Sequence, residues 1–182
     1  MLQLFIQDAK RWIVPCGFDE STPLTFTLTL KMMYQQPSLR MMFWFRIAQW
    51  GRHNGVPAIP GIMFRRIMRR FGAEISLDAP IAGGLYIAHP VGVTLFPRSM
   101  GENCSVIAGV TIGMRNIHEF PDVGNNVFIG AGARLLGDIK VGDDTLIGAN
   151  SVVIKDVPDG ATVVGIPGKV ISIYGERAVP AN

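Results

Sequence analysis

The chain has 182 residues, of which 48% are hydrophobic and 17% are charged, and its formal net charge is +3. This composition supports one buried core and excludes a disordered chain, and no stretch reaches the roughly 18 apolar residues that span a membrane. The two cysteines, Cys16 and Cys104, lie far apart without metal-ligand spacing, which excludes a disulfide framework. The first residues lack the order of a signal peptide, so we expect a cytoplasmic protein.

Residues 1–72 carry aromatic and basic residues at helical spacing and predict an N-terminal helical segment. Residues 1–37 are weakly patterned, and we expect a short helix followed by a loop through Pro23. Ser38 is a candidate N-cap for a helix that reaches Trp50. The residues expected on one apolar side of this helix are Met42, Phe43, Ile47 and Trp50.

A second helix is expected from about Pro60, since proline suits the first turn. Its apolar arc consists of Met63, Phe64, Ile67, Met68 and Phe71, and the opposite arc carries Arg65, Arg66, Arg69 and Arg70. In one interpretation the apolar arc caps the end of the following domain and the arginines are simply solvated. In the other, the arginines hold the protein near anionic lipid head groups at the inner face of a membrane. No motif supports binding to nucleic acid.

From residue 73 onward, an aliphatic residue leads each unit of a six-residue repeat and a small residue often follows it. The leading residues of the strict second half are Val123, Ile129, Leu135, Val141, Ile147 and Val153. Those of the first half are Ile75, Ile81, Ile87 and Val93 and, after a slip of one residue, Met100, Val106 and Ile112. Three units make one turn of a left-handed parallel β-helix, so we predict a mainly β prism of about four to five coils after the helical segment.

Beyond this slip, a longer insertion interrupts the repeat, and it indicates a functional site. Val123 follows Ile112 by eleven positions instead of six, so the segment between them must protrude as a loop, which carries His118. The only other histidine of the prism, His89, lies in the unit IAHPVG.

Four segments of the prism carry a family resemblance: GLYIAHPVGVTL, GENCSVIAGVTIG, VGNNVFIGAGARLLGDIKVG and VPDGATVVGIPGKVI. Together they resemble the serine acetyltransferase group of hexapeptide acyltransferases, over about residues 72–171. Within that group the chain looks closest to the short O-acetyltransferases of exopolysaccharide or colanic-acid type, which have a helical lead-in of this size. The resemblance implies homotrimers that bind acetyl-CoA, the acyl donor, in the grooves between neighbouring prisms, and it implies no metal.

The resemblance places the catalytic histidine at His89 and its supporting acid at Glu74, where the family commonly has Asp. The residue types fit the chemistry, because an alcohol attacks a thioester only when a base such as neutral imidazole removes its proton. A carboxylate on the other ring nitrogen would fix the tautomer and stabilise the imidazolium.

The acceptor-binding positions of the family are altered in this chain. In serine acetyltransferases an acidic residue before the catalytic histidine holds the substrate amine, and here that position is Ala88. The basic pair of the protruding loop that meets the substrate carboxylate aligns with Glu119 and Phe120, next to His118. Both changes remove groups that recognise an amino acid, so the expected acceptor is a hydroxyl of a saccharide or exopolysaccharide precursor, near His118, Glu119 and Phe120. His118 either contacts that acceptor, lies near the thioester, or is an ordinary exposed histidine of the loop.

The resemblance also implies a set of cofactor-binding positions. They are Gly113 and Met114 at the loop entrance, and Ala131 and Ala149, which are one coil apart. Small residues would let the pantetheine arm approach the backbone. Lys169, in the segment GIPGKV, is the candidate partner of the nucleotide phosphates.

The sequence therefore predicts a helical segment (residues 1–72), a β-helix acyltransferase domain with a protruding loop at 113–122 (residues 73–171) and a tail (172–182). The predicted activity is acetyl transfer from acetyl-CoA to a saccharide hydroxyl. The alternatives are serine O-acetyltransferase of cysteine biosynthesis and a non-catalytic scaffold. A metal enzyme resembling the γ-class carbonic anhydrases is disfavoured, because its site needs three histidines and the prism has two.

Overall fold

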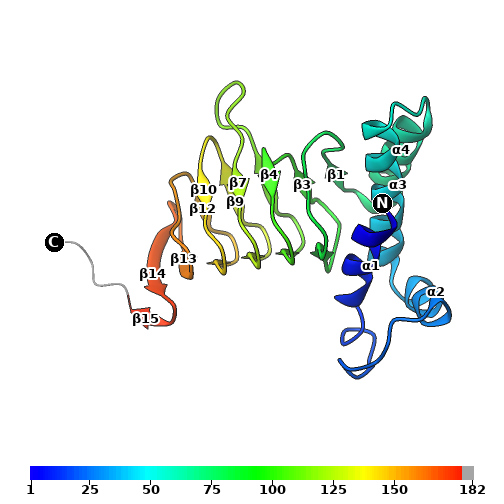
Figure 1. The fold of residues 1–182 in the computed structure, drawn as a ribbon. Coiled ribbons are helices and arrows are strands. Elements are labelled where there is room, and N and C mark those ends of the chain that lie inside the picture. The colour runs from blue at the N-terminus through cyan, green and yellow to red at the C-terminus, as the bar shows by residue number, and fades with distance from the viewer. Residues whose placement is uncertain (178–182) are drawn as a thin grey trace.

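The computed structural model describes residues 1–177, in which a group of helices packs against one end of a β-helix (Figure 1). The helices are α1 (Leu2–Lys10), α2 (Phe26–Gln35), α3 (Pro37–His53) and α4 (Ile59–Phe71). Among the described residues, no helix combines the length and the hydropathy that crossing a membrane requires.

The start of α3 differs from the predicted one. Its N-cap is Gln36, which makes no side-chain cap bond, and Ser38 lies inside the first turn. The Ser38 hydroxyl donates instead to the carbonyl of Ala88, at 3.1 Å, so this serine ties the helix to the prism. The helix α2 was not predicted, because residues 1–37 are weakly patterned. Its N-cap is Thr25, whose hydroxyl accepts from the backbone N–H of Leu28.

The helix predicted from Pro60 is confirmed as α4. Pro60 lies in its first turn, and Gly72 ends it in the left-handed conformation with φ +64°, which glycine adopts without strain. Ile67 is fully buried, whereas Met68 at the edge of the predicted apolar arc is 39% exposed. The four arginines of α4 are all exposed.

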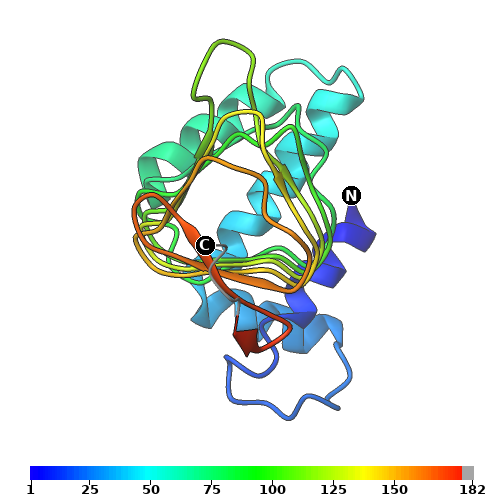
Figure 2. The ribbon, with the colours of Figure 1, turned by 90° about the vertical axis from the view of Figure 1, so that its left-hand side faces the viewer.

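The strands wind into a prism of three flat faces, which appears as a triangle when viewed along its axis (Figure 2). The first coils contain β1 (Glu74–Ile75), β2 (Tyr86–Ile87), β3 (Thr94–Leu95), β4 (Ser99–Met100), β5 (Ser105–Val106), β6 (Thr111–Gly113) and β7 (Asp122–Val123). The later ones contain β8 (Phe128–Ile129), β9 (Arg134–Leu136), β10 (Lys140–Val141), β11 (Leu146–Ile147), β12 (Val152–Val153), β13 (Ala161–Val164), β14 (Lys169–Ile173) and β15 (Glu176–Arg177).

Each face is one sheet. The five-stranded sheet has the order β1-β3-β6-β9-β12, the three-stranded sheet β10-β7-β4, and the seven-stranded sheet β15-β14-β13-β11-β8-β5-β2. Pairing between coils is parallel, as the predicted left-handed parallel β-helix requires. Among the described strands, the antiparallel pairs are β13–β14 and β14–β15, and β14 and β15 extend the seven-stranded sheet past the last coil. The predicted tail boundary at residue 172 therefore falls inside β14, and residues 178–182 of that tail lie outside the described residues.

The leading residues of the six-residue repeat form the core of the prism, as predicted. The slip in the repeat has a specific location. Leu95, and not Val93, stacks in register between Ile75 and Ile112, so the chain takes eight positions from Ile87 to Leu95 instead of six. The extra residues widen the corner that contains His89.

The helical segment closes the N-terminal end of the prism, which confirms the capping interpretation of its apolar residues. Met41, Met42, Phe45 and Ile67 belong to the same buried cluster as the first coils. The division of the chain at residues 72–73 stays a prediction, because the helices and the prism share this core.

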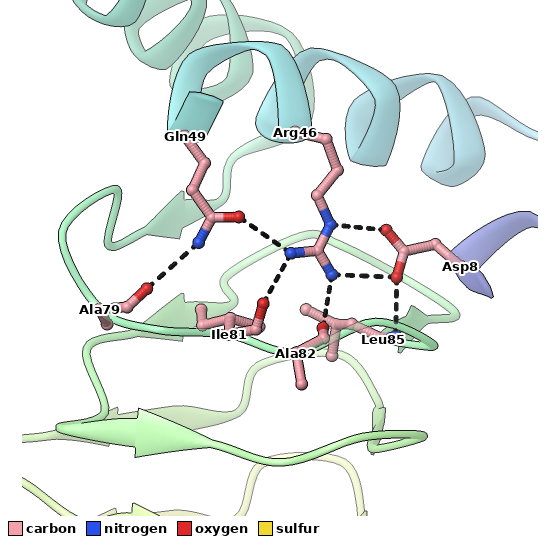
Figure 3. A network of polar contacts seen from close by, with 7 residues as sticks. All are labelled: Asp8, Arg46, Gln49, Ala79, Ile81, Ala82 and Leu85. Atoms are coloured by element: carbon pink, nitrogen blue, oxygen red, sulfur yellow. Dashed lines mark hydrogen bonds and ion pairs between the residues drawn. The ribbon is translucent and has the colours of Figure 1, made fainter. Parts of the chain in front are cut away.

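A buried ion pair also anchors the helices (Figure 3). The guanidinium of Arg46 donates to both carboxylate oxygens of Asp8, at 2.8 and 3.0 Å, and the two side chains are 1% and 0% exposed. Arg46 also donates to the carbonyls of Ile81 and Ala82 and to the side chain of Gln49. Burial raises the pKa of Asp8, and the bonds from Arg46 oppose that effect. Arg46 and Gln49 thus face inward on α3, and the predicted inward residue Trp50 is 43% exposed.

Candidate active site

His89 lies on the edge of the prism where the seven-stranded sheet gives way to the five-stranded sheet, which we call the histidine edge. Ala131 and Ala149, which follow β8 and β11, lie on the same edge in later coils. Backbone hydrogen bonds join successive coils along it, including Gly132 N–H to Ala108 O and Asn150 N–H to Ala131 O, both at 2.8 Å. The structure therefore brings the predicted base and two predicted cofactor positions into one line.

The wide corner at His89 opens into a hollow of about 550 Å³. Its lining comes from the prism corner, from the start of α3 and from the end of α4: Gln36, Pro37, Ser38, Arg70, Phe71, Gly72, Ala88, His89, Pro90 and Val91. The side chain of His89 is exposed, and the bond from Ser38 to Ala88 fixes the residue before it against α3. An exposed imidazole in a hollow of this size can meet a small hydroxyl compound from solvent.

Glu74 lies at the start of β1, one coil before the strand that follows His89. Its backbone N–H donates to Val93 O, at 2.8 Å, and its side chain is half-buried. Glu74 is not part of the hollow's lining, and the hydrogen bonds of the described residues include none between its carboxylate and His89. The predicted pair is thus placed in neighbouring coils without a direct bond.

The protruding loop leaves the prism at a different edge, between the five-stranded and three-stranded sheets, as Figure 2 shows. There His118 is exposed and Glu119 is half-buried. The amide of Asn116 donates to the Glu119 carboxylate at 2.7 Å. Gly113 and Met114, at the base of the loop, share this edge. Within one chain, the loop residues His118, Glu119 and Phe120 therefore lie on a different edge of the prism from His89.

Lys169 begins β14 and pairs with Val164 at the C-terminal end of the seven-stranded sheet. Its side chain is exposed. Like Ala131 and Ala149, it lies beyond the coil that carries His89. Within residues 1–177, no three histidine, cysteine or acidic side chains converge in a way that could hold a metal ion.

Arg70 is the charged side chain of α4 that lines the hollow, and the sequence assigned it to a different role. The helical pattern placed it on the basic face of α4 together with Arg69, yet it also lines the hollow of His89. The signal lies in Gly72, a helix-ending glycine two residues later and directly before the first repeat, which places the last turn of α4 against the first coil.

Comparison with protein families matches residues 121–155 to the model described as bacterial transferase hexapeptide (six repeats). The chain is 36% identical to the serine acetyltransferase of Synechococcus elongatus over 157 residues, which are 84% of this chain and 64% of that protein. It is 37% identical to the serine acetyltransferase of Mycobacterium tuberculosis over 148 residues, 78% of this chain and 64% of that one. The chain thus spans slightly less than two thirds of the length of these relatives.

Solved structures of serine acetyltransferases are also similar to this chain. Serine acetyltransferase of Neisseria gonorrhoeae in complex with serine superposes with a TM-score of 0.77 at 28% identity, covering 94% of this chain and 69% of that one. A serine acetyltransferase in complex with CoA also gives 0.77, at 27% identity, with coverage of 93% and 69%. Together with the repeat, these findings make the chain a hexapeptide-repeat protein with serine acetyltransferases among its relatives.

These relatives correct the acceptor predicted from the sequence. The saccharide acceptor, and the narrowing to exopolysaccharide or colanic-acid enzymes, rested on Ala88, Glu119 and Phe120 standing where the resemblance implies an amino-acid clamp. Both the curated relatives and the solved structures are serine acetyltransferases, which favours the alternative. The error lay in inferring a different substrate class from lost groups without knowing what else lines the site.

Proposed function

We propose that this protein transfers the acetyl group of acetyl-CoA to the hydroxyl of L-serine. The observation that carries the proposal is the exposed imidazole of His89 in a hollow of about 550 Å³, on an edge with small residues in the following coils. The similarity to serine acetyltransferases over most of this chain supports the choice of donor and acceptor.

In the proposed reaction a ring nitrogen of His89 accepts the hydroxyl proton of serine while the serine oxygen attacks the thioester carbonyl. The tetrahedral intermediate then collapses, the carbon–sulfur bond breaks, and the leaving thiolate takes the proton from the imidazolium. The products are O-acetylserine and CoA, so no other reactant is needed. Glu74 would stabilise the imidazolium only if its side chain moves toward His89, since no direct bond joins the two residues.

The remaining predicted site residues fit a site shared between copies of the chain. His118, Glu119 and Phe120 would contact the acceptor of a neighbouring subunit, because their loop leaves a different edge from His89 (Figure 2). Acetyl-CoA would then lie between the histidine edge of one copy, with Ala131 and Ala149, and the loop base of another, with Gly113 and Met114. Lys169 would meet its phosphates. A homotrimer is the assembly that repeats this contact on all three prisms.

The basic face of α4 fits an additional contact with anionic lipid head groups, as one interpretation of the sequence holds. Its arginines are exposed, and they line a surface hollow of about 460 Å³ together with the half-exposed Ile62. Arg66 additionally stacks on the ring of Trp44, at 5.0 Å from the ring centre. Co-sedimentation with anionic vesicles at low and high salt tests this contact, and a flat profile would remove it.

The experiment for the main proposal follows CoA release from acetyl-CoA by the purified full chain, with and without L-serine. We expect serine-dependent release, and a loss of roughly 10² to 10⁴ in rate for His89→Ala, because a general base is removed. The variant should still bind acetyl-CoA, since the base acts on the acceptor. No serine-dependent release by the wild type, or a His89→Ala variant with more than half of its turnover, would refute the assignment. A non-catalytic scaffold would bind no acetyl-CoA at all.

A further inference from the structure

The hollow of His89 contains one fixed charge, which comes from the helical segment and not from the prism. Arg70 and Phe71, in the last turn of α4, line the hollow together with His89. We propose that Arg70 binds the carboxylate of the acceptor and thereby restricts the site to small hydroxy compounds that carry an anionic group. This inference rests on the proposed acetyl transfer and adds the residue that selects the substrate.

The position of Arg70 relative to His89 is fixed by the backbone. Gly72 ends α4, and its carbonyl accepts from the N–H of Gly92 at 2.9 Å, in the turn between His89 and β3. On the other side, Ser38 of α3 binds Ala88. The end of α4 and the wide corner therefore form one wall of the hollow, and these bonds hold the backbone of Arg70 beside the corner that carries His89.

The guanidinium of Arg70 is free to bind a ligand. Its side chain is exposed, and the ion pairs within residues 1–177 involve Arg46, Arg52 and Arg98 instead. The lining of the hollow contains no aspartate or glutamate. Arg65, Arg66 and Arg69 line the adjoining hollow on α4, so positively charged side chains are concentrated on this side of the helix.

A carboxylate is the group that such a site recognises best. Guanidinium binds it through two parallel hydrogen bonds, which fix orientation as well as position. Bound in this way, a compound with a hydroxyl close to its carboxylate would place that hydroxyl near the imidazole of His89. This arrangement also explains how an amino acid can be recognised although Glu119 and Phe120 occupy the loop positions that the family resemblance assigns to carboxylate binding.

The test compares Arg70→Gln with the control Arg69→Gln. The control removes the same charge from the neighbouring position of the same helix, and Arg69 does not line the hollow of His89. The acceptors are L-serine and L-serinamide, in which a neutral amide replaces the carboxylate. Loss of a charge-assisted hydrogen bond should raise the KM for L-serine by roughly 10- to 100-fold in Arg70→Gln, with kcat changed much less. The wild type and Arg69→Gln should prefer L-serine over L-serinamide in kcat/KM, and Arg70→Gln should lose that preference.

Calorimetric titration with L-serine separates this proposal from the acetyl transfer itself. We expect L-serine to bind the wild type and Arg69→Gln at least 10-fold more tightly than Arg70→Gln. This result supports the carboxylate site even if no acetyl group is transferred. In that case only the proposed activity fails. Equal affinity in Arg70→Gln, an equal loss in both variants, or no binding of L-serine to the wild type overturns the assignment of Arg70. Circular dichroism of both variants checks that the helices are retained.

Discussion

Replacing Arg46 by methionine should destabilise the protein strongly, because it leaves a buried charge without its partner. The guanidinium makes two hydrogen bonds to Asp8, one to Gln49 and one each to the carbonyls of Ile81 and Ala82. In the variant the carboxylate of Asp8, 0% exposed, would keep only backbone donors, the N–H of Leu85 at 2.9 Å and that of Gly84. Breaking a buried pair in this way costs about 3 to 5 kcal/mol.

The pH dependence gives this prediction a second measurable consequence. Burial raises the pKa of Asp8, and without Arg46 the bonds that lower it are largely lost. The folded variant then holds the proton of Asp8 more tightly than the unfolded chain, so the contribution of Asp8 to stability is most favourable at low pH and falls as pH rises. The cost of Arg46→Met should therefore be larger at pH 8 than at pH 5.

Urea unfolding at fixed protein concentration measures these effects, since an oligomer's stability depends on concentration. The double variant Asp8→Leu/Arg46→Met should recover at least half of the loss, because it removes both charges. Arg52→Met is the matched control. Its pair with Asp78 is 56% and 70% exposed, and breaking it should change stability by less than about 1 kcal/mol. A cost below about 1 kcal/mol for Arg46→Met, or a double variant less stable than the single one, would refute the reasoning.

Two further predictions concern the prism. Gly130→Ala should lower the free energy of unfolding in urea by about 1 to 3 kcal/mol, because the added methyl would lie 2.7 Å from the backbone nitrogen of Ala149. Gly113→Ala is the control and should cost little, since its added methyl would meet nothing within 4 Å. Equal costs for the two variants would contradict the packing argument. Burial raises the pKa of Cys104 to about 11, so the unfolded thiol ionises first and the unfolding free energy should fall as pH rises from about 9 to 11. Cys104→Ala should flatten that slope, and an unchanged slope would show that other groups cause it.

The prism could be predicted from the sequence because each coil repeats one local rule. Ile129, Leu135 and Val141 point inward at a fixed spacing, and glycine at the corners lets successive coils approach. The helical segment follows no such repeat. Arg46 and Gln49 are buried by long-range partners in α1 and the first coil, so hydrophobic periodicity alone assigns them to the surface.

The candidate site divides in the same way. The sequence could single out His89 and the loop as candidates, because the loop interrupts the regular repeat and His89 is one of two histidines within it. Arg70 belongs to the hollow only through the turn at Gly72, and a helical pattern contains no information about where that turn places it. The wrong acceptor followed from this gap, since counting lost family residues cannot reveal a charge that arrives from another segment.

The two irregularities of the repeat favour a site assembled from more than one chain. The corner at His89 is two residues wider than a regular corner, and the loop after β6 is longer still. They lie on different edges of the triangle (Figure 2), and the hollow at His89 has a side that is open to solvent. A second prism that places its loop edge against the histidine edge would close that side and bring His118 to the acceptor. Dilution below the dissociation constant of the oligomer should then lower the turnover number while leaving the secondary structure of each chain intact. A turnover number independent of concentration for chains that light scattering shows to be monomeric would exclude the shared site and leave His89 and Arg70 to act within one chain.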